Sequence, residues 1–160
     1  MATQKITPFL WFDGKAEEAI NLYTSIFKNS KIISLSNWEE GSPYPKGQVM
    51  TGIFKLDGQR FYAFDAGPMF KFTEATSFFV NCDTQEEIDY FWEKLTADGG
   101  QESMCGWLKD KFGLSWQIVP PVLVKFIGDK DREKAGRAMQ AMMKMKKIII
   151  ADLENAYEGK

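Results

Sequence analysis

The chain contains one sequence pattern twice, and a spacing of 69 residues relates the two copies. In each copy a strand-like apolar run leads into a segment with apolar residues at helical spacing. The spacing superposes Glu17-Glu18 on Glu86-Glu87 and one apolar helix face on the other: Ala19 on Ile88, Leu22 on Phe91, Tyr23 on Trp92 and Ile26 on Leu95. A repeat of this length predicts two similar supersecondary units.

Each copy is predicted to be a βαβββ module. In module one, Asp57-Gly58 joins two strand-like runs and is a strong signal for a tight hairpin. In module two, Gly99-Gly100 ends the helix and Asp110-Lys-Phe-Gly113 separates the last two strands. The predicted strands are 6–12, 32–38, 48–56 and 60–65 in module one, and 76–82, 102–108 and 114–119 in module two.

Beyond Pro120-Pro121 the sequence becomes helical, with apolar residues on one side of segment 129–147 and Lys or Arg on the other. We therefore expect a single domain over 1–160, made of module one (about 5–67), module two (about 75–120) and a C-terminal helical extension (about 121–160). A chain of 160 residues is long enough for one sizeable core. The basic side of the extension is expected to be a solvated helix face.

Charge and apolar content exclude two classes of partner. Twenty Lys plus Arg against 22 Asp plus Glu give a net charge of −2, so no overall positive field attracts nucleic acid. The longest apolar runs fall far short of the roughly 20 residues that span a bilayer. Two cysteines are too few for a disulfide framework and no basic-then-apolar leader opens the chain, so we expect a cytoplasmic protein.

The chain has no histidine, which restricts its chemistry more than any residue that it does contain. A histidine-ligated metal, a Ser-His or Cys-His pair and a histidine base are all excluded. Cys105 has no histidine to activate it, and both Cys82 and Cys105 are expected to be structural thiols.

The order of elements and four segments resemble a known superfamily. TPFLWFDGKAEEAINLYTSIF, VMTGIFKLDGQRFYAFDAGP, QEEIDYFWEKL and CGWLKDKFGLSWQIVP are similar to the PhnB-like branch of the vicinal oxygen chelate superfamily, often labelled "3-demethylubiquinone-9 3-methyltransferase" domain. The resemblance implies an α+β, glyoxalase-like fold in which two βαβββ modules form a cupped mixed sheet. It also implies a cavity, a homodimer and a divalent metal on inward-facing strand residues.

The metal positions of the superfamily carry unsuitable residues in this chain. Mapped residue by residue, they fall on Pro8, Tyr62, Ser77 and Gln117, which together offer no imidazole and no carboxylate. A shift of one residue would expose neighbours such as Thr7, Ala63 or Thr76, which are no better as ligands. Because first-row divalent ions need several, usually charged, donors to replace their water, we predict no metal and no other cofactor.

Without a metal, the expected cavity is an aromatic pocket with a few polar groups. Strand alternation predicts that eight residues share one face, with Asn81 beside them. We expect this face to bind a small, partly aromatic or apolar molecule. The eight residues are Pro8, Leu10, Phe12, Tyr62, Phe64, Ser77, Phe79 and Gln117. An ordinary packed core is the alternative for the same residues. Segment 39–46 has the composition of a loop, either a lid over the cavity or a plain connector.

Other functions stay open at this stage. A lyase or isomerase would use Tyr62 or Asp65 as proton donor or acceptor, although alternation turns Asp65 away from Tyr62. The family label names a methyltransferase, but the sequence has no strand followed by a glycine-rich turn and a helix, the pattern that holds a nucleotide-like cofactor. A dimeric scaffold whose C-terminal helices contact another protein is the third reading.

Overall fold

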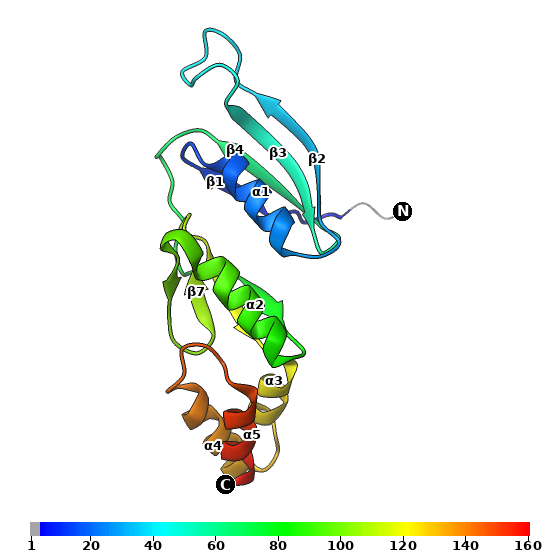
Figure 1. Cartoon of the computed structure of the whole chain (residues 1–160), viewed down its shortest axis with the longest axis vertical. Helices are drawn as coiled ribbons and strands as arrows, with labels where there is room; N and C mark the ends of the chain where they lie inside the picture. Colours follow the sequence, from blue (N-terminus) through cyan, green and yellow to red (C-terminus); the bar gives the residue numbers. More distant parts are fainter. Residues whose placement is uncertain (1–3) are drawn as a thin grey trace. The chain divides into compact units, whose positions relative to one another are not determined.

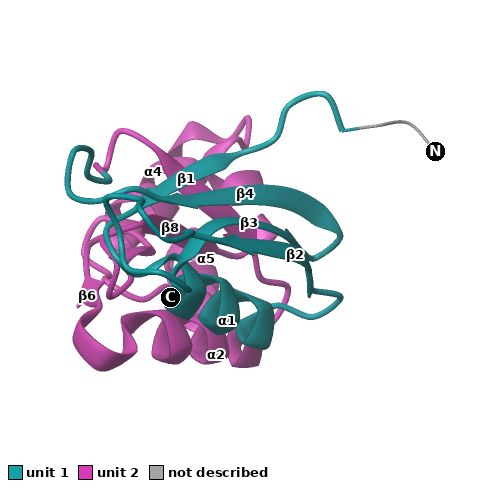
Figure 2. Ribbon diagram, turned by 90° about the horizontal axis from the view of Figure 1, so that it is seen from above, with its two compact units in different colours: residues 1–72 teal, residues 73–160 magenta. Residues whose placement is uncertain are grey.

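The computed structural model describes residues 4–160, which form two compact units. Unit 1 extends to Phe72 and unit 2 is Thr73–Lys160, and Figure 2 colours them separately. Each unit contains a four-stranded mixed sheet and a helix in the order βαβββ, which confirms the predicted α+β fold with two such modules. None of the helices in this part of the chain is long and apolar enough to cross a membrane.

Unit 1 is built from β1 (Phe9–Phe12), α1 (Ala16–Ile26), β2 (Lys31–Asn37), β3 (Val49–Leu56) and β4 (Gln59–Asp65). The sheet order is β1-β4-β3-β2, with β1 parallel to β4 and the other pairs antiparallel. The β3–β4 hairpin turns at Asp57 and Gly58, both with positive φ, as the sequence predicted.

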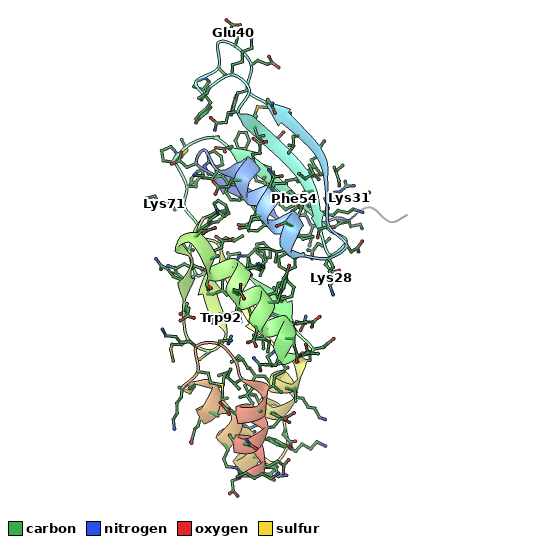
Figure 3. The ribbon with its side chains drawn as sticks, viewed as in Figure 1. Lys28, Lys31, Glu40, Phe54, Lys71 and Trp92 are labelled. Atoms are coloured by element: carbon green, nitrogen blue, oxygen red, sulfur yellow. The ribbon has the colours of Figure 1, made fainter. Side chains whose placement is uncertain are left out.

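Helix α1 lies across one face of the sheet (Figure 1) and buries the core of unit 1. Its buried residues include Ala19, Ile20 and Tyr23, and the strands contribute Leu10, Phe12 and Phe54, the last labelled in Figure 3. Gly52 fits under the helix because any Cβ there would lie 2.3 Å from the Cδ1 atom of Ile20. We call this the covered face of unit 1 and the opposite side the open face.

Asp65 joins the last strand of unit 1 to the start of α1. Its Oδ1 accepts a hydrogen bond from the Gly14 N–H at 2.6 Å, and its Oδ2 accepts one from the Ala16 N–H at 2.9 Å. The first N–H groups of a helix have no partner within the helix, and Lys15 at the N-cap makes no side-chain cap bond. Asp65, only 1% exposed, therefore supplies the cap from a distant part of the sequence.

Unit 2 repeats this order with β5 (Ser77–Asn81), α2 (Gln85–Thr96), a 3₁₀ turn (Ala97–Gly99), β6 (Gln101–Glu102), β7 (Trp107–Lys109) and β8 (Ser115–Val119). The sheet order is β5-β8-β7-β6. The strand predicted over 102–108 is interrupted: Cys105 and Gly106 have positive φ and turn the chain, so that β6 and β7 pair with each other. Asp110 begins the predicted turn to β8 by accepting hydrogen bonds from the N–H groups of Phe112 and Leu114.

The C-terminal segment forms three helices: α3 (Pro121–Ile127), α4 (Arg132–Met142) and α5 (Ile150–Glu158). Segment 144–149 is not continuous helix, unlike the sequence expectation for 129–147, because it runs back to the sheet. There the Cys105 and Gly106 N–H groups donate to the carbonyls of Met145 and Lys146. Ile148 and Leu153 are fully buried, so the extension shares the core of unit 2.

Two side chains hold α5 in place. Arg137 donates to the carbonyls of Ala156 and Tyr157, at the C-terminal end of α5. The Tyr157 hydroxyl donates to Asp129 at 2.6 Å, and this hydrogen bond raises the pKa of Tyr157 to about 12 and lowers that of Asp129.

Replacing Asp65 should destabilise unit 1. Asp65→Ala removes two hydrogen bonds to a carboxylate and leaves the N-terminus of α1 uncapped, so we expect a loss of about 3 kcal/mol in the free energy of unfolding. Urea titration followed by circular dichroism measures this loss. Asp13→Ala, which removes an exposed carboxylate beside the same helix, should change the stability little, and an equal loss in both variants would contradict the assigned cap.

The two cysteines should differ in reactivity. Burial, and secondarily the charges of Glu87 and Asp83, raise the pKa of the Cys82 thiol to about 12, whereas Cys105 is partly exposed. At pH 8 the folded protein should therefore react with iodoacetamide at Cys105 and not at Cys82, because the thiolate is the nucleophile. Peptide mass spectrometry locates the label. Labelling of Cys82 at the rate seen in urea would show that the thiol is not buried.

Candidate functional site

The open face of unit 1 carries a cluster of aromatic side chains. The register places Phe9 beside Tyr62 and Trp11 beside Phe64 on the parallel strands β1 and β4. The ring centroids of Phe9 lie 6.3 Å from Tyr62 and 6.1 Å from Phe64, and those of Trp11 and Phe64 lie 5.1 Å apart. Phe9 is 60% exposed and the other three are half-buried, so these rings present accessible apolar surface.

The backbone just after β4 fixes one end of this cluster. The carbonyls of three successive residues, Asp65, Ala66 and Gly67, each accept a hydrogen bond from an aromatic side chain: Trp38 Nε1 at 3.0 Å, the Tyr44 hydroxyl, and Trp11 Nε1 at 2.8 Å. Trp38 also lies 4.8 Å from Tyr44 and 6.3 Å from Phe64 between ring centroids. Aromatic rings whose polar ends are satisfied in this way are held in fixed positions.

Glycine is required at position 67. Its φ of +80° is a conformation that other residues rarely adopt, and an added Cβ would lie 2.9 Å from the Tyr44 hydroxyl oxygen. Segment 39–46, expected to be a lid or a connector, thus has Tyr44 anchored to the backbone beside the open face.

Exposed apolar residues border the cluster at the next loop. Met69 is 75% exposed and Phe70 is 59% exposed, and the Phe70 ring packs edge-on to Trp11 with 5.0 Å between centroids. The aromatic surface therefore continues from the strands into this loop.

The side of the unit 2 sheet that carries Ser77, Phe79 and Gln117, which we call the open face of unit 2, is more polar. Ser77, Phe79 and Gln117 lie on the same side of β5 and β8, and Gln117 Nε2 donates to Ser77 Oγ at 2.8 Å. Phe79 is 46% exposed, whereas Ser115, also on β8, is fully buried and its hydroxyl has no hydrogen-bond partner within residues 4–160.

The structure corrects the predicted faces of two residues. Leu10 and Phe12 pair with Ala63 and Asp65 on the covered face of unit 1, where they are 5% and 3% exposed, and do not share a face with Tyr62 and Phe64. Pro8 immediately precedes β1, and its carbonyl accepts a hydrogen bond from the Tyr62 N–H.

The error has a simple physical cause. In unit 1 the last strand residue on the covered face is Phe12, and the helix begins four residues later at Ala16. In unit 2 the corresponding strand residue is Val80, and the helix begins five residues later at Gln85. The connection in unit 2 is one residue longer, so the 69-residue spacing that fits the helices places β1 and β5 on opposite faces. A slip of one residue moves every side chain of a strand to the other face.

Sequence reasoning missed Phe9 and Trp11 for the same reason. All four residues of β1 are apolar, so the alternation of polar and apolar residues that marks the two faces of a strand is absent. Of the candidates for proton transfer, Tyr62 lies on the open face, while both oxygens of Asp65 accept bonds from the start of α1 on the covered face.

The donors of neither open face are typical of a metal site. Within residues 4–160 there is no group of three or more His, Cys, Asp or Glu side chains that could hold an ion. The mapped positions Tyr62, Ser77 and Gln117 provide a phenol, a hydroxyl and an amide, which are neutral donors.

Comparison with known proteins places this geometry in a family. A family model described as 3-demethylubiquinone-9 3-methyltransferase matches residues 4–119. The structure of a PhnB protein from Bacillus cereus is 45% identical, covers 73% of this chain and 99% of that chain, and superposes with a TM-score of 0.69. The chain has no match among curated proteins.

More distant structures share the fold. Protein PA1353 from Pseudomonas aeruginosa is 21% identical with a TM-score of 0.61, over 74% of this chain and 98% of that one. The fosfomycin resistance protein FosX from Listeria monocytogenes, complexed with Mn(II) and sulfate ion, is 17% identical with a TM-score of 0.51, over 72% of this chain and 90% of that one. Given the extent of the family match and the identity to the PhnB protein, the chain belongs to the PhnB-like, 3-demethylubiquinone-9 3-methyltransferase family.

Proposed function

We propose that this protein binds a small, partly aromatic or apolar molecule on an open sheet face, without a metal ion. The observation that carries the proposal is the aromatic cluster of unit 1, in which Phe9, Trp11, Tyr62 and Phe64 lie side by side on the face that α1 leaves uncovered. A surface of tilted and edge-on rings with a hydroxyl at Tyr62 suits a ligand with an apolar or partly aromatic body.

Metal independence is supported by the residues themselves. FosX, which shares the fold, is complexed with Mn(II), whereas this chain has no histidine and presents neutral groups at the mapped positions. Neutral hydroxyl and amide oxygens do not replace the water of a divalent ion without carboxylate or imidazole partners. In unit 2, Ser77 and Gln117 form a hydrogen bond with each other, which uses part of their hydrogen-bonding capacity.

Binding is a better-supported role than proton transfer. Asp65 is committed to the N-terminus of α1, which leaves the Tyr62 hydroxyl as the accessible group of the two candidates. The Tyr62 hydroxyl can donate a hydrogen bond to a bound ligand or accept one from it.

We also propose a cytoplasmic homodimer. The two free cysteines suit a reducing compartment. Strand β2 is an outer strand of its sheet, all of its residues are exposed, and Ile32, Ile33 and Leu35 are each about two-fifths exposed. An apolar outer strand is a site for association with another chain, and a second copy is the occupant that the proposal names.

The aromatic site can be tested with the neutral fluorescent compound N-phenyl-1-naphthylamine. We expect its fluorescence to rise on binding, and Phe9→Ala to weaken binding by about tenfold, which corresponds to loss of roughly 1.4 kcal/mol of ring contact. Because Phe9 is 60% exposed, its removal should leave the melting temperature nearly unchanged.

Controls separate this site from general stickiness and from metal dependence. Tyr90→Ala removes an aromatic ring from the exposed side of α2 and should not affect binding. Dialysis against EDTA should also leave binding unchanged. An equal loss of probe binding in Phe9→Ala and Tyr90→Ala would reject the proposed site. A loss of probe binding after dialysis against EDTA would reject metal independence.

The dimer is tested by light scattering. We expect twice the mass of one chain at micromolar concentration, and a monomer for Ile33→Lys, because a charge at an apolar contact opposes association. Ile6→Lys adds the same charge at an 86% exposed residue outside the strands and should remain dimeric. A monomeric parent protein would contradict the dimer, and a dimeric Ile33→Lys variant would exclude β2 as the interface.

A further inference from the structure

Three cations stand in a row across the open face of unit 1. The register pairs Lys31 of β2 directly with Lys55 of β3, and Lys55 directly with Arg60 of β4. Residues directly opposite each other on antiparallel strands point to the same face, and their Cβ atoms lie roughly 5 Å apart. Tyr62 and Ile53 form the next pair along the same two strands, so the row borders the aromatic cluster.

No acidic residue in the described part of the chain forms an ion pair with this row. None of the ion pairs formed within residues 4–160 includes Lys31, Lys55 or Arg60. Asp57, in the adjacent turn, is exposed and forms no ion pair with them in this part of the chain. Like charges directly opposite each other destabilise a sheet. Water and dissolved ions, and no acidic side chain among residues 4–160, therefore screen the charges of this row.

Protection of a sheet edge does not explain the row. A lysine at the end of an outer strand commonly limits pairing at that end, which accounts for Lys31 at the start of β2 and leaves the apolar residues of β2 available for association. Lys55 and Arg60, however, lie on the inner strands β3 and β4 and are half-buried. Figure 3 shows Lys31 at the margin of unit 1, on β2.

The position of Arg60 is fixed by its backbone. Its N–H donates to Gln4 Oε1 at 2.9 Å and its carbonyl accepts from Gln4 Nε2 at 3.0 Å, so the Gln4 amide pairs with β4 as a strand would. The backbone of Lys55 is held by the β3–β4 ladder. Two of the three cations are thus attached to rigid backbone.

We propose that this row binds the oxyanion of the ligand, a carboxylate, sulfonate, phosphate or phosphonate group, while the aromatic cluster binds its apolar body. The proposal rests on the proposed function and names the class of molecule for the same face. Two residues along a strand span roughly 7 Å, so Arg60 and Tyr62 are separated by the length of a small aromatic acid. Guanidinium and ammonium groups bind such oxyanions through charge-assisted hydrogen bonds.

A matched pair of probes tests the proposal. 8-Anilinonaphthalene-1-sulfonate is N-phenyl-1-naphthylamine with an added sulfonate group, so the two compounds differ by the anion alone. We expect the sulfonate to bind about tenfold more tightly than the neutral compound at low salt, as one charge-assisted contact would give. This preference should shrink in 1 M NaCl. The chain's net charge of −2 would by itself favour the neutral compound.

Variants assign the preference to the row. The double variant Lys55→Gln/Arg60→Gln should bind both probes equally, with binding of the neutral probe unchanged. Lys130→Gln/Lys144→Gln removes two exposed lysines of unit 2 that form no ion pair within the described chain, and should keep the preference.

The outcomes separate this inference from the function on which it rests. If the parent protein binds the neutral probe but shows no preference for the sulfonate, the oxyanion site is wrong and the aromatic site stands. If it binds neither, the aromatic site itself is wrong. Two further outcomes would overturn the assignment to Lys55 and Arg60. One is an equal loss of the preference for the sulfonate in both double variants. The other is loss of neutral-probe binding in Lys55→Gln/Arg60→Gln while the circular dichroism spectrum is unchanged.

Discussion

One helix cannot cover both faces of a sheet, and the properties of unit 1 follow from this constraint. Helix α1 buries the face that carries Leu10, Phe12 and Phe54, and the strands then direct every second residue to the side without a helix. In a chain that evolved only to fold, that side would carry polar residues. Here it carries Phe9, Trp11, Tyr62 and Phe64, so the open face presents apolar surface that α1 does not bury.

Several parts of this structure follow from the sequence because their signals are local. The Asp57-Gly58 turn and the Asp110 to Gly113 turn depend on residues that tolerate positive φ or hydrogen-bond their own backbone. The two helices follow the 69-residue spacing because their apolar faces repeat with helical period. Ala19 and Ile88 are both fully buried, and the exposed fractions of Tyr23 and Trp92 are 0% and 5%.

Other parts depend on information that no local pattern contains. The face of each β1 residue is decided by the length of the connection to α1, since the strand is apolar on both sides. The cap of α1 is supplied by Asp65, 49 residues after Ala16, which the spacing of charges near the helix does not indicate. The hydrogen bonds from Trp11, Trp38 and Tyr44 to carbonyls 65–67 likewise join three separate segments, and only the folded chain brings them together.

The residues on the open face of unit 1 suit one kind of binding chemistry better than another. A metal centre concentrates charge at one point and therefore needs anionic or imidazole ligands, which the mapped positions lack. In the proposed site, an aromatic surface beside a row of cations would distribute recognition over a longer distance, with rings for the apolar part of a ligand and Lys55 and Arg60 for its charge. An anion lying among the cations would lower their mutual repulsion further than water and salt do. On this argument, binding of an anionic ligand should stabilise unit 1 by more than its contacts with the rings alone.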